Sequence, residues 1–344
     1  MTSHKHLSFF LMIVVVLTGF GGGAATALAA GDDTPRPLYL PMMVQQDNQA
    51  YNTPTPAWLD HLNSMRAVGN LPALIENGAW SDGCDLHTRY MIKNDVMEHQ
   101  EDPDNIWYTA EGAAAAGNSN LMMSTNVARD DTYAVDLWLS GPFHGLGLLD
   151  PELLSTGYGS YREAVGTWRM GACMDVLRGL GSTPPSVTYP VQWPASGKVM
   201  PFLEYNGSEF PDPLSSCPGY TAPSGPPIYL LLGNGNLTPS VSAHSLTTAG
   251  QPLEHCIFDE NTYDGVYTDL ARSVLNARDA VVVIPRQPLT PGARYTVSIT
   301  ANGQTYRWSF TATSTPRSAS AAAPTETPGI PGEMLSEPLP EPGY

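Results

Sequence analysis

Apolar positions at helical spacing open the predicted folded region. Trp58, Leu59, Leu62 and Met65 recur three or four residues apart, with Arg66 beside them, so one face of a helix is apolar. Two further helices are predicted, over residues 81–96, with Cys84, His87 and Met91 on one face, and from residue 130 or 131 to Gly141-Pro142. Residues 157–161 and 165–174 follow as strands, so this region mixes helices with strands.

Alternating apolar positions dominate the C-terminal region. Residues 183–225 are dense in proline and glycine and mark a boundary. Beyond it, residues 228–232 and 280–284 are short apolar runs. Residues 295–299 and 306–310 alternate on either side of Asn302-Gly303, which is typical of a type I′ hairpin turn. The pattern predicts an all-β unit, a small sandwich.

The N-terminus has the pattern of a secretory signal. A weakly basic start around Lys5 precedes the apolar residues 9–20, and Ala27-Leu28-Ala29 is a small-x-small cleavage site. A retained membrane anchor is the alternative, but the apolar run is shorter than the roughly 20 residues of a bilayer span. We therefore expect a signal peptide over residues 1–29, no membrane span after its removal, and a secreted or cell-surface protein.

Composition narrows the possible partners. The chain has 344 residues, Lys+Arg 16 against Asp+Glu 33, and a formal net charge of -17. Phosphate backbones require clustered Lys and Arg, so this acid excess excludes nucleic acid as a partner. The polar residues 30–56 predict a linker, and the Pro, Ser, Ala and Glu of residues 314–344 predict a disordered tail.

Four cysteines fit an exported chain with disulfide bonds. They are Cys84, Cys173, Cys217 and Cys256, and free buried thiols are the alternative. Of the three possible connectivities, the predicted domain boundaries favour Cys84–Cys173 with Cys217–Cys256.

Three residues are candidate metal ligands. His99 and His144 lie at the ends of predicted helices, and Glu111 lies between them in the chain. Imidazole is the commonest protein ligand of metals, and a catalytic zinc uses three protein ligands before water. The alternative is that these polar residues cap helices.

Six short motifs follow one another along this region. They are Leu62-Asn63-Ser64-Met65-Arg66, Leu71-Pro72-Ala73-Leu74, a helix ending at His99, Ala110-Glu111-Gly112, Trp138-Leu139-Ser140-Gly141-Pro142-Phe143-His144 and Gly157-Tyr158-Gly159. Their order resembles the CAP superfamily (cysteine-rich secretory proteins, antigen 5 and pathogenesis-related 1), especially its bacterial secreted branch. The resemblance implies a CAP, or SCP-like, domain over residues 57–190.

The resemblance also implies a fold and a site. The fold is α+β, an α-β-α sandwich with an open cleft, in which His99, His144 and Glu111 would bind zinc or another divalent cation. Ala110-Glu111-Gly112 departs from the family's Gly-Glu-Asn, and near Ser140 no carboxylate stands where animal and plant members have a second acid. Ser140 and His87 are possible cleft residues, and a satisfied core histidine is the alternative for His87.

Residues 191–220 are expected to connect this domain to the β-sandwich of residues 221–313. The pattern from Pro285 to Thr311 resembles the immunoglobulin-like modules of bacterial surface proteins. Aromatic residues of the connector either stack on sugars or pack between the domains; they are Trp193, Tyr205 and Phe210. The acidic run formed by Glu98, Glu101, Asp102 and Asp104 is either a calcium site or a solvated loop.

The sequence predicts an exported binding protein for an extracellular lipid, glycan, cell-wall or protein ligand. One alternative is a metal-dependent hydrolase or protease, in which Glu111 acts as general base towards a metal-bound water. Another is a surface adhesin that binds through its β-sandwich. The chain carries no Gly-x-Ser-x-Gly or His-Glu-x-x-His motif, which favours binding over catalysis.

Overall fold

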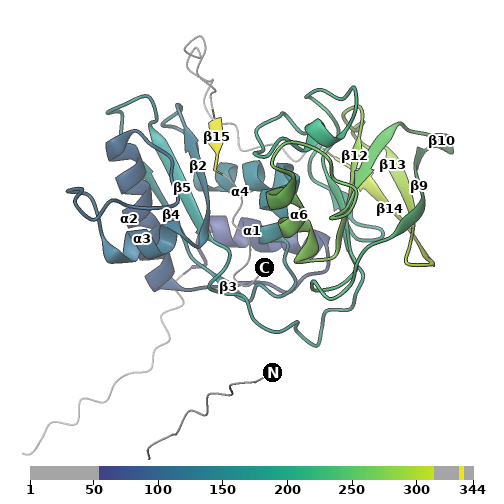
Figure 1. Ribbon diagram of the computed structural model, residues 1–344, viewed down its shortest axis with the longest axis horizontal. Coiled ribbons are helices and arrows are strands. Elements are labelled where there is room, and N and C mark those ends of the chain that lie inside the picture. The colour runs from purple at the N-terminus through teal and green to yellow at the C-terminus, as the bar shows by residue number, and fades with distance from the viewer. Residues whose placement is uncertain (1–53, 314–332, 337–344) are drawn as a thin grey trace, which may run out of the picture. The chain divides into compact units, whose positions relative to one another are not determined.

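One antiparallel sheet organises the N-terminal region in the computed structural model, which describes residues 54–313 and 333–336 (Figure 1). Its strand order is β15 (Glu333–Leu335), β2 (Ser119–Ser124), β5 (Met170–Asp175) and β4 (Tyr158–Arg162). The predicted signal peptide, and most of the predicted linker and tail, lie outside the described residues. Residues 333–336 differ from the prediction for the tail, because they pair with β2 as a strand.

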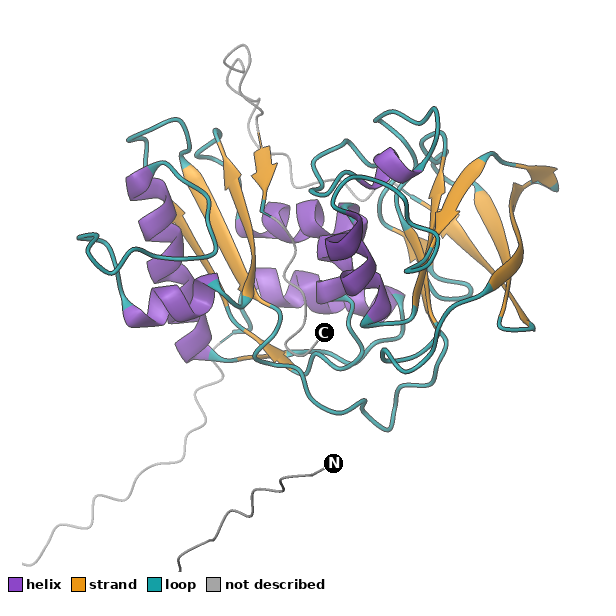
Figure 2. Cartoon of the chain, viewed as in Figure 1, coloured by secondary structure: helices purple, strands orange, loops and turns teal. Residues whose placement is uncertain are grey.

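Helices cover both faces of this sheet (Figure 2). Leu121 and Met123 of β2 pack in a small core with α2 (Gly78–Asn94) and α3 (Ala110–Ala116), whereas Met122 faces the larger core. That larger core includes residues of α1 (Ala57–Val68) and α4 (Asp131–Ser140). Since successive strand residues point to opposite faces, the arrangement is α-β-α, as the resemblance to the CAP superfamily implies. The mixture of helices and sheets is α+β.

Side-chain caps set the helix boundaries. Asn77 accepts a hydrogen bond from the backbone N–H of Trp80, so α2 begins before residue 81, where the sequence pattern predicts its start. Asp130 caps α4 in the same way, through the N–H of Tyr133. Asp95, with φ 55°, ends α2 in the left-handed region, so His99 lies in the following loop rather than on the helix.

Two further sheets form the C-terminal region. The first has the order β10 (Gln251–Pro252), β9 (Val241–Thr248), β13 (Arg294–Ala301), β14 (Gln304–Ala312) and β7 (Val199–Met200). The second has the order β11 (His255–Phe258), β12 (Ala280–Pro285), β8 (Ile228–Leu231) and β6 (Val191–Trp193). A short pair, β1 (Ile75–Glu76) with β3 (Ser155–Thr156), stands apart from both.

The predicted hairpin is confirmed in position and register. Tyr295 pairs with Phe310 and Val297 with Trp308. Asn302 and its following glycine have φ values of 50° and 79°, as a type I′ turn requires.

The prediction of an all-β unit is wrong for α6 (Thr268–Asn276). Its buried residues Ala271, Val274 and Leu275 recur at three- and four-residue spacing, so a helical pattern was present in the sequence. The predicted connector also contributes structure, since it supplies β6, β7 and the short 3₁₀ helix η1 (Pro213–Ser216).

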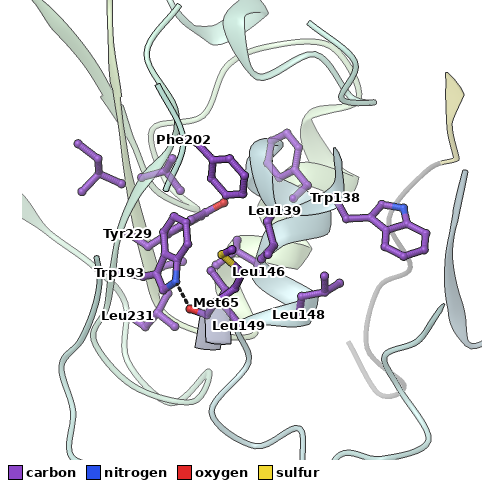
Figure 3. Packing of buried hydrophobic residues seen from close by; sticks show 14 of the residues in the cluster. Met65, Trp138, Leu139, Leu146, Leu148, Leu149, Trp193, Phe202, Tyr229 and Leu231 are labelled. Atoms are coloured by element: carbon purple, nitrogen blue, oxygen red, sulfur yellow. Dashed lines mark hydrogen bonds between the residues drawn. The ribbon is translucent and has the colours of Figure 1, made fainter. Parts of the chain in front are cut away.

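A single large core contains residues from both regions (Figure 3). Trp193 of β6 is fully buried and donates through Nε1 to the carbonyl of Met65 in α1 at 2.9 Å. A Cβ on Gly69 would lie 2.9 Å from the Trp193 ring, so this packing needs the glycine. The hydroxyl of Tyr229 donates to the carbonyl of Gly141. Trp193 and Tyr205 are therefore packing residues and are not available to stack on sugars.

The cysteines form the predicted pairs. Cys84–Cys173 joins α2 to β5, and Cys217–Cys256 joins the end of η1 to β11. Among the described residues, no helix is long and apolar enough to cross a membrane.

Candidate functional site

A cavity of about 660 Å³ opens beside His99. Three segments line it: the loop after α2, the residues before η1, and the C-terminal strand segment. The lining residues are Met97, Glu98, His99, Gln100, Gly207, Ser208, Phe210, Glu333, Met334, Leu335 and Ser336. The wall thus combines apolar side chains with hydrogen-bonding groups, as ligand pockets usually do.

His87 holds the loop that carries His99. It is fully buried, with Nδ1 2.9 Å from a carboxylate oxygen of Glu101 and Nε2 3.0 Å from the carbonyl of Glu98. Because both partners accept, each ring nitrogen donates to the loop when it carries a hydrogen. His87 is thus a core residue with partners, and it acts on the cavity through the loop.

Two more groups fix the same loop. The hydroxyl of Tyr90 donates to Glu98 at 3.1 Å and accepts from the N–H of Asp102 at 3.1 Å. Burial, the largest cause, raises the pKa of Tyr90 above its ordinary value. The second carboxylate oxygen of Glu101 accepts from the N–H of Thr109 at 2.9 Å, just before α3. Glu101 therefore ties α2, the loop and α3 together.

His99 stands at the cavity wall. Its Nδ1 donates to the carbonyl of Ala116, at the end of α3, over 2.7 Å. The side chain is half-buried and lines the cavity. Of the three candidate ligands named from the sequence, only His99 lines this cavity.

His144 lies in a different environment. It is fully buried in the first turn of α5 (Pro142–Leu148), where Nδ1 donates to a carboxylate oxygen of Glu209. The other oxygen of Glu209 faces the backbone N–H groups of Phe143 and His144, at 3.2 Å and 3.4 Å. Glu209 thus caps α5 from 65 residues away in the chain. Nε2 of His144 has no hydrogen-bond partner among the described residues.

The two remaining candidates lie elsewhere. Glu111 is exposed in the first turn of α3. Ser140 is buried and donates to the carbonyl of Leu137, one turn earlier in α4.

The donor set does not fit a metal ion. Within residues 54–313 and 333–336, no group of three or more His, Cys, Asp or Glu side chains is placed to hold one. His144 is sequestered by Glu209, and Glu111 points away to solvent. The unpartnered Nε2 of His144 is a single donor, whereas a zinc site uses at least three protein ligands. Zinc binding therefore remains a prediction without support from this geometry.

Two partners in this region were missed from the sequence. Glu209 stands in the proline-rich connector between Tyr205 and Phe210, and nothing in its spacing points to His144. Arg129 binds Glu333, which lies in the predicted disordered tail. The isolated Glu-Met-Leu of residues 333–335 was the only available signal, and three residues are too few to indicate a strand.

Comparisons with known proteins are sparse. No protein-family model matches the chain, and no curated protein sequence matches it. Among solved structures, it is similar to the 1.5 Å crystal structure of an extracellular protein containing an SCP domain from Bacillus anthracis. The identity is 18%, the TM-score is 0.27, and the match covers 34% of this chain and 38% of that one. The chain thus spans well under half of that protein.

Proposed function

We propose that this chain is an exported CAP-type binding protein that takes a neutral amphiphile, such as an uncharged lipid, into the cavity beside His99. The lining of the cavity carries the proposal. Met97, Phe210 and Met334 offer apolar surface for a hydrocarbon chain, and Gln100 and Ser208 offer polar groups for the other end of the ligand. The order of the CAP-like motifs, the α-β-α arrangement and the signal pattern support the class and the export.

The negative charge around the cavity favours a neutral ligand over a fatty acid. Two lining residues, Glu98 and Glu333, carry carboxylates, and the whole chain has a formal net charge of -17. The cation nearest Glu333, Arg129, already donates to it. A ligand carboxylate would therefore meet repulsion in this cavity.

Burial of His144 and Glu209 favours binding over hydrolysis. A general acid or base must reach the substrate within hydrogen-bond distance. His144 is fully buried and Glu209 is 5% exposed, and the two side chains bind each other. Neither side chain lines the cavity beside His99.

The test is equilibrium binding of a fluorescent monoacylglycerol to the mature protein. Gln100→Trp should fill the cavity and weaken binding by about tenfold or more, which corresponds to about 1.4 kcal/mol. Gln304→Trp, an exposed position at the start of β14, is the matched control and should bind normally. The corresponding fluorescent fatty acid should bind more weakly than the monoacylglycerol. Equal binding by the two tryptophan variants would exclude this cavity as the site.

A zinc-binding measurement distinguishes the proposed lipid-binding protein from a metal-dependent hydrolase. A hydrolase centred on the histidines requires saturable zinc binding that is lost in His99→Ala. His244 and His255, whose ring nitrogens lie 2.8 Å apart on β9 and β11, form a separate surface pair. Zinc bound by this surface pair is removed by a His244→Ala control variant. In that background, the proposal predicts that calorimetry detects no zinc binding that depends on His99.

A further inference from the structure

The outer edge of β2 is covered by a very short strand. β2 pairs with β5 along all six of its residues and, on the other side, with the three residues of β15. Every position of β2 is buried. Without its short neighbour, β2 would present unpaired N–H and C=O groups, which form a template for adding another strand.

Arg129 recognises the first residue of β15. Its Nη2 and Nε donate to one carboxylate oxygen of Glu333 at 2.7 Å and 3.1 Å. The guanidinium carbon lies 3.9 Å from the ring centroid of Tyr133 in α4. Stacking of this kind holds an arginine in place, so Arg129 is oriented to receive a carboxylate at this position of an added strand.

The next positions alternate as in a bound peptide. Met334 is 37% exposed and points outward, whereas Leu335 is 4% exposed and belongs to the large core. Ser336 continues along the edge, where its hydroxyl accepts from the N–H of Leu121 at 3.3 Å. Along this edge an acid thus meets Arg129, the next side chain lies at the cavity beside His99, an aliphatic residue enters the core, and a small hydroxyl bonds to β2.

We propose that the edge of β2, with Arg129, is a peptide-binding groove for an extended segment of the pattern acid-x-aliphatic-Ser in a partner protein, and that residues 333–336 occupy it in cis. Main-chain pairing supplies affinity in such strand addition, and pockets for alternate side chains supply specificity. Residues 333–336 also line the cavity beside His99, so their exchange would alter that cavity. Peptide binding at this edge itself requires no lipid, so it can be tested in lipid-free protein and can succeed where lipid binding fails.

The cis strand is suited to exchange. A strand of three residues is short, and such pairing is marginal unless a tether or side-chain contacts support it. Tethering within one chain raises the effective concentration of a segment to about 1 mM at most for short linkers. A partner segment with better contacts can therefore displace residues 333–336 at lower concentrations.

The test uses the full-length chain and a fluorescein-labelled peptide of residues 331–338. In the double variant Glu333→Lys/Leu335→Asp, the release variant, the cis segment loses both its acid and its aliphatic residue. We expect this variant to bind the peptide at least about tenfold more tightly than the wild type, whose groove is filled. A control peptide with the same Lys and Asp changes should not bind. Adding Arg129→Ala to the release variant should weaken binding about tenfold, since a charge-assisted pair is lost.

Two results would overturn the proposal. One is a release variant that keeps wild-type near-ultraviolet circular dichroism yet binds the labelled and control peptides equally. The other is peptide binding that does not change with Arg129→Ala. If the release variant does not fold, a protease site inserted at residues 322–324 of the wild type allows the folded chain to be cut. The fragment containing residues 333–336 should then dissociate on dilution, and the labelled peptide should take its place. If the fragment stays bound at nanomolar protein concentration in the presence of added peptide, exchange is contradicted.

Discussion

The carboxylate of Glu209 binds Nδ1 of His144 and also caps the helix on which His144 stands. One side chain from the segment between β7 and η1 thereby fixes α5, which packs against both α4 and α6. The hydroxyl of Tyr205 accepts from the N–H of Glu209 at 3.2 Å and orients it. His144, a metal-ligand candidate in the sequence, therefore joins α5 to the segment before η1 through its hydrogen bond to Glu209.

Removal of this carboxylate should destabilise the whole described chain. Glu209→Ala leaves Nδ1 of His144 and two backbone N–H groups buried without an acceptor. Breaking a buried pair in this way costs about 3–5 kcal/mol. Urea unfolding should show that loss for Glu209→Ala and almost none for Glu204→Ala, a half-exposed acid in the same segment. Equal midpoints for the two variants would refute the role of Glu209.

Substitution of His87 should loosen the loop that carries His99. His87→Ala removes two hydrogen bonds, to Glu98 and Glu101, and leaves the Glu101 carboxylate buried. Hydrogen exchange should quicken over residues 95–109 more than elsewhere, because these bonds fix that segment. Asp82→Ala, an exposed position on the same helix, is the control. Unchanged protection of residues 95–109 in a folded His87→Ala protein would contradict this assignment.

The pH dependence of stability should reveal the raised pKa of Glu260. Burial, followed by the nearby carboxylates of Asp279 and Asp259, raises its pKa from 4.5 to about 7. A carboxyl with a raised folded-state pKa favours the protonated form, so its ionisation costs stability as pH rises from about 4.5 to about 7. The free energy of unfolding of Glu260→Gln, minus that of wild type, should therefore increase across this window and stay constant above it. Asp264→Asn, an exposed control, should show no such increase, and a flat difference for Glu260→Gln would be inconsistent with a raised pKa.

The two disulfides should differ in their resistance to reduction. Cys84 and Cys173 are fully buried, whereas Cys256 is half-buried. Thiol exchange requires access to a sulfur, so mild phosphine treatment of the native protein should open Cys217–Cys256 first. Peptide mapping after iodoacetamide should find label on Cys217 and Cys256 well before Cys84 and Cys173. Earlier labelling of Cys84 would show that the N-terminal core is more open than described.

The sequence predicted those elements whose formation depends on interactions between residues close together in the chain. The stripe of α1, the start of α4 and the Asn302-Gly303 turn each depend on residues within a few positions. The disulfide pairing followed from the placement of domain boundaries. The α6 helix was missed because its apolar stripe has only three buried residues and no side chain caps its start.

The site was less predictable because its contacts are distant in sequence. Glu209 reaches His144 over 65 residues, and Glu333 reaches Arg129 over 204. Neither partner is marked by spacing, and a polar residue in a proline-rich segment is equally consistent with solvent exposure. The sequence leaves two interpretations of His87 open, since a buried histidine needs a partner and only the fold brings Glu101 to it.

The histidine side chains allow the most direct test of ligand binding beside His99. Two-dimensional NMR of the imidazole groups, with and without a monoacylglycerol, reports which rings sense the ligand. Binding in the cavity predicts a shift of the His99 signals, with those of His87 and His144 nearly unchanged behind the wall. Saturable lipid binding that leaves His99 unshifted, or that shifts His244 and His255 instead, would place the ligand elsewhere and contradict the account.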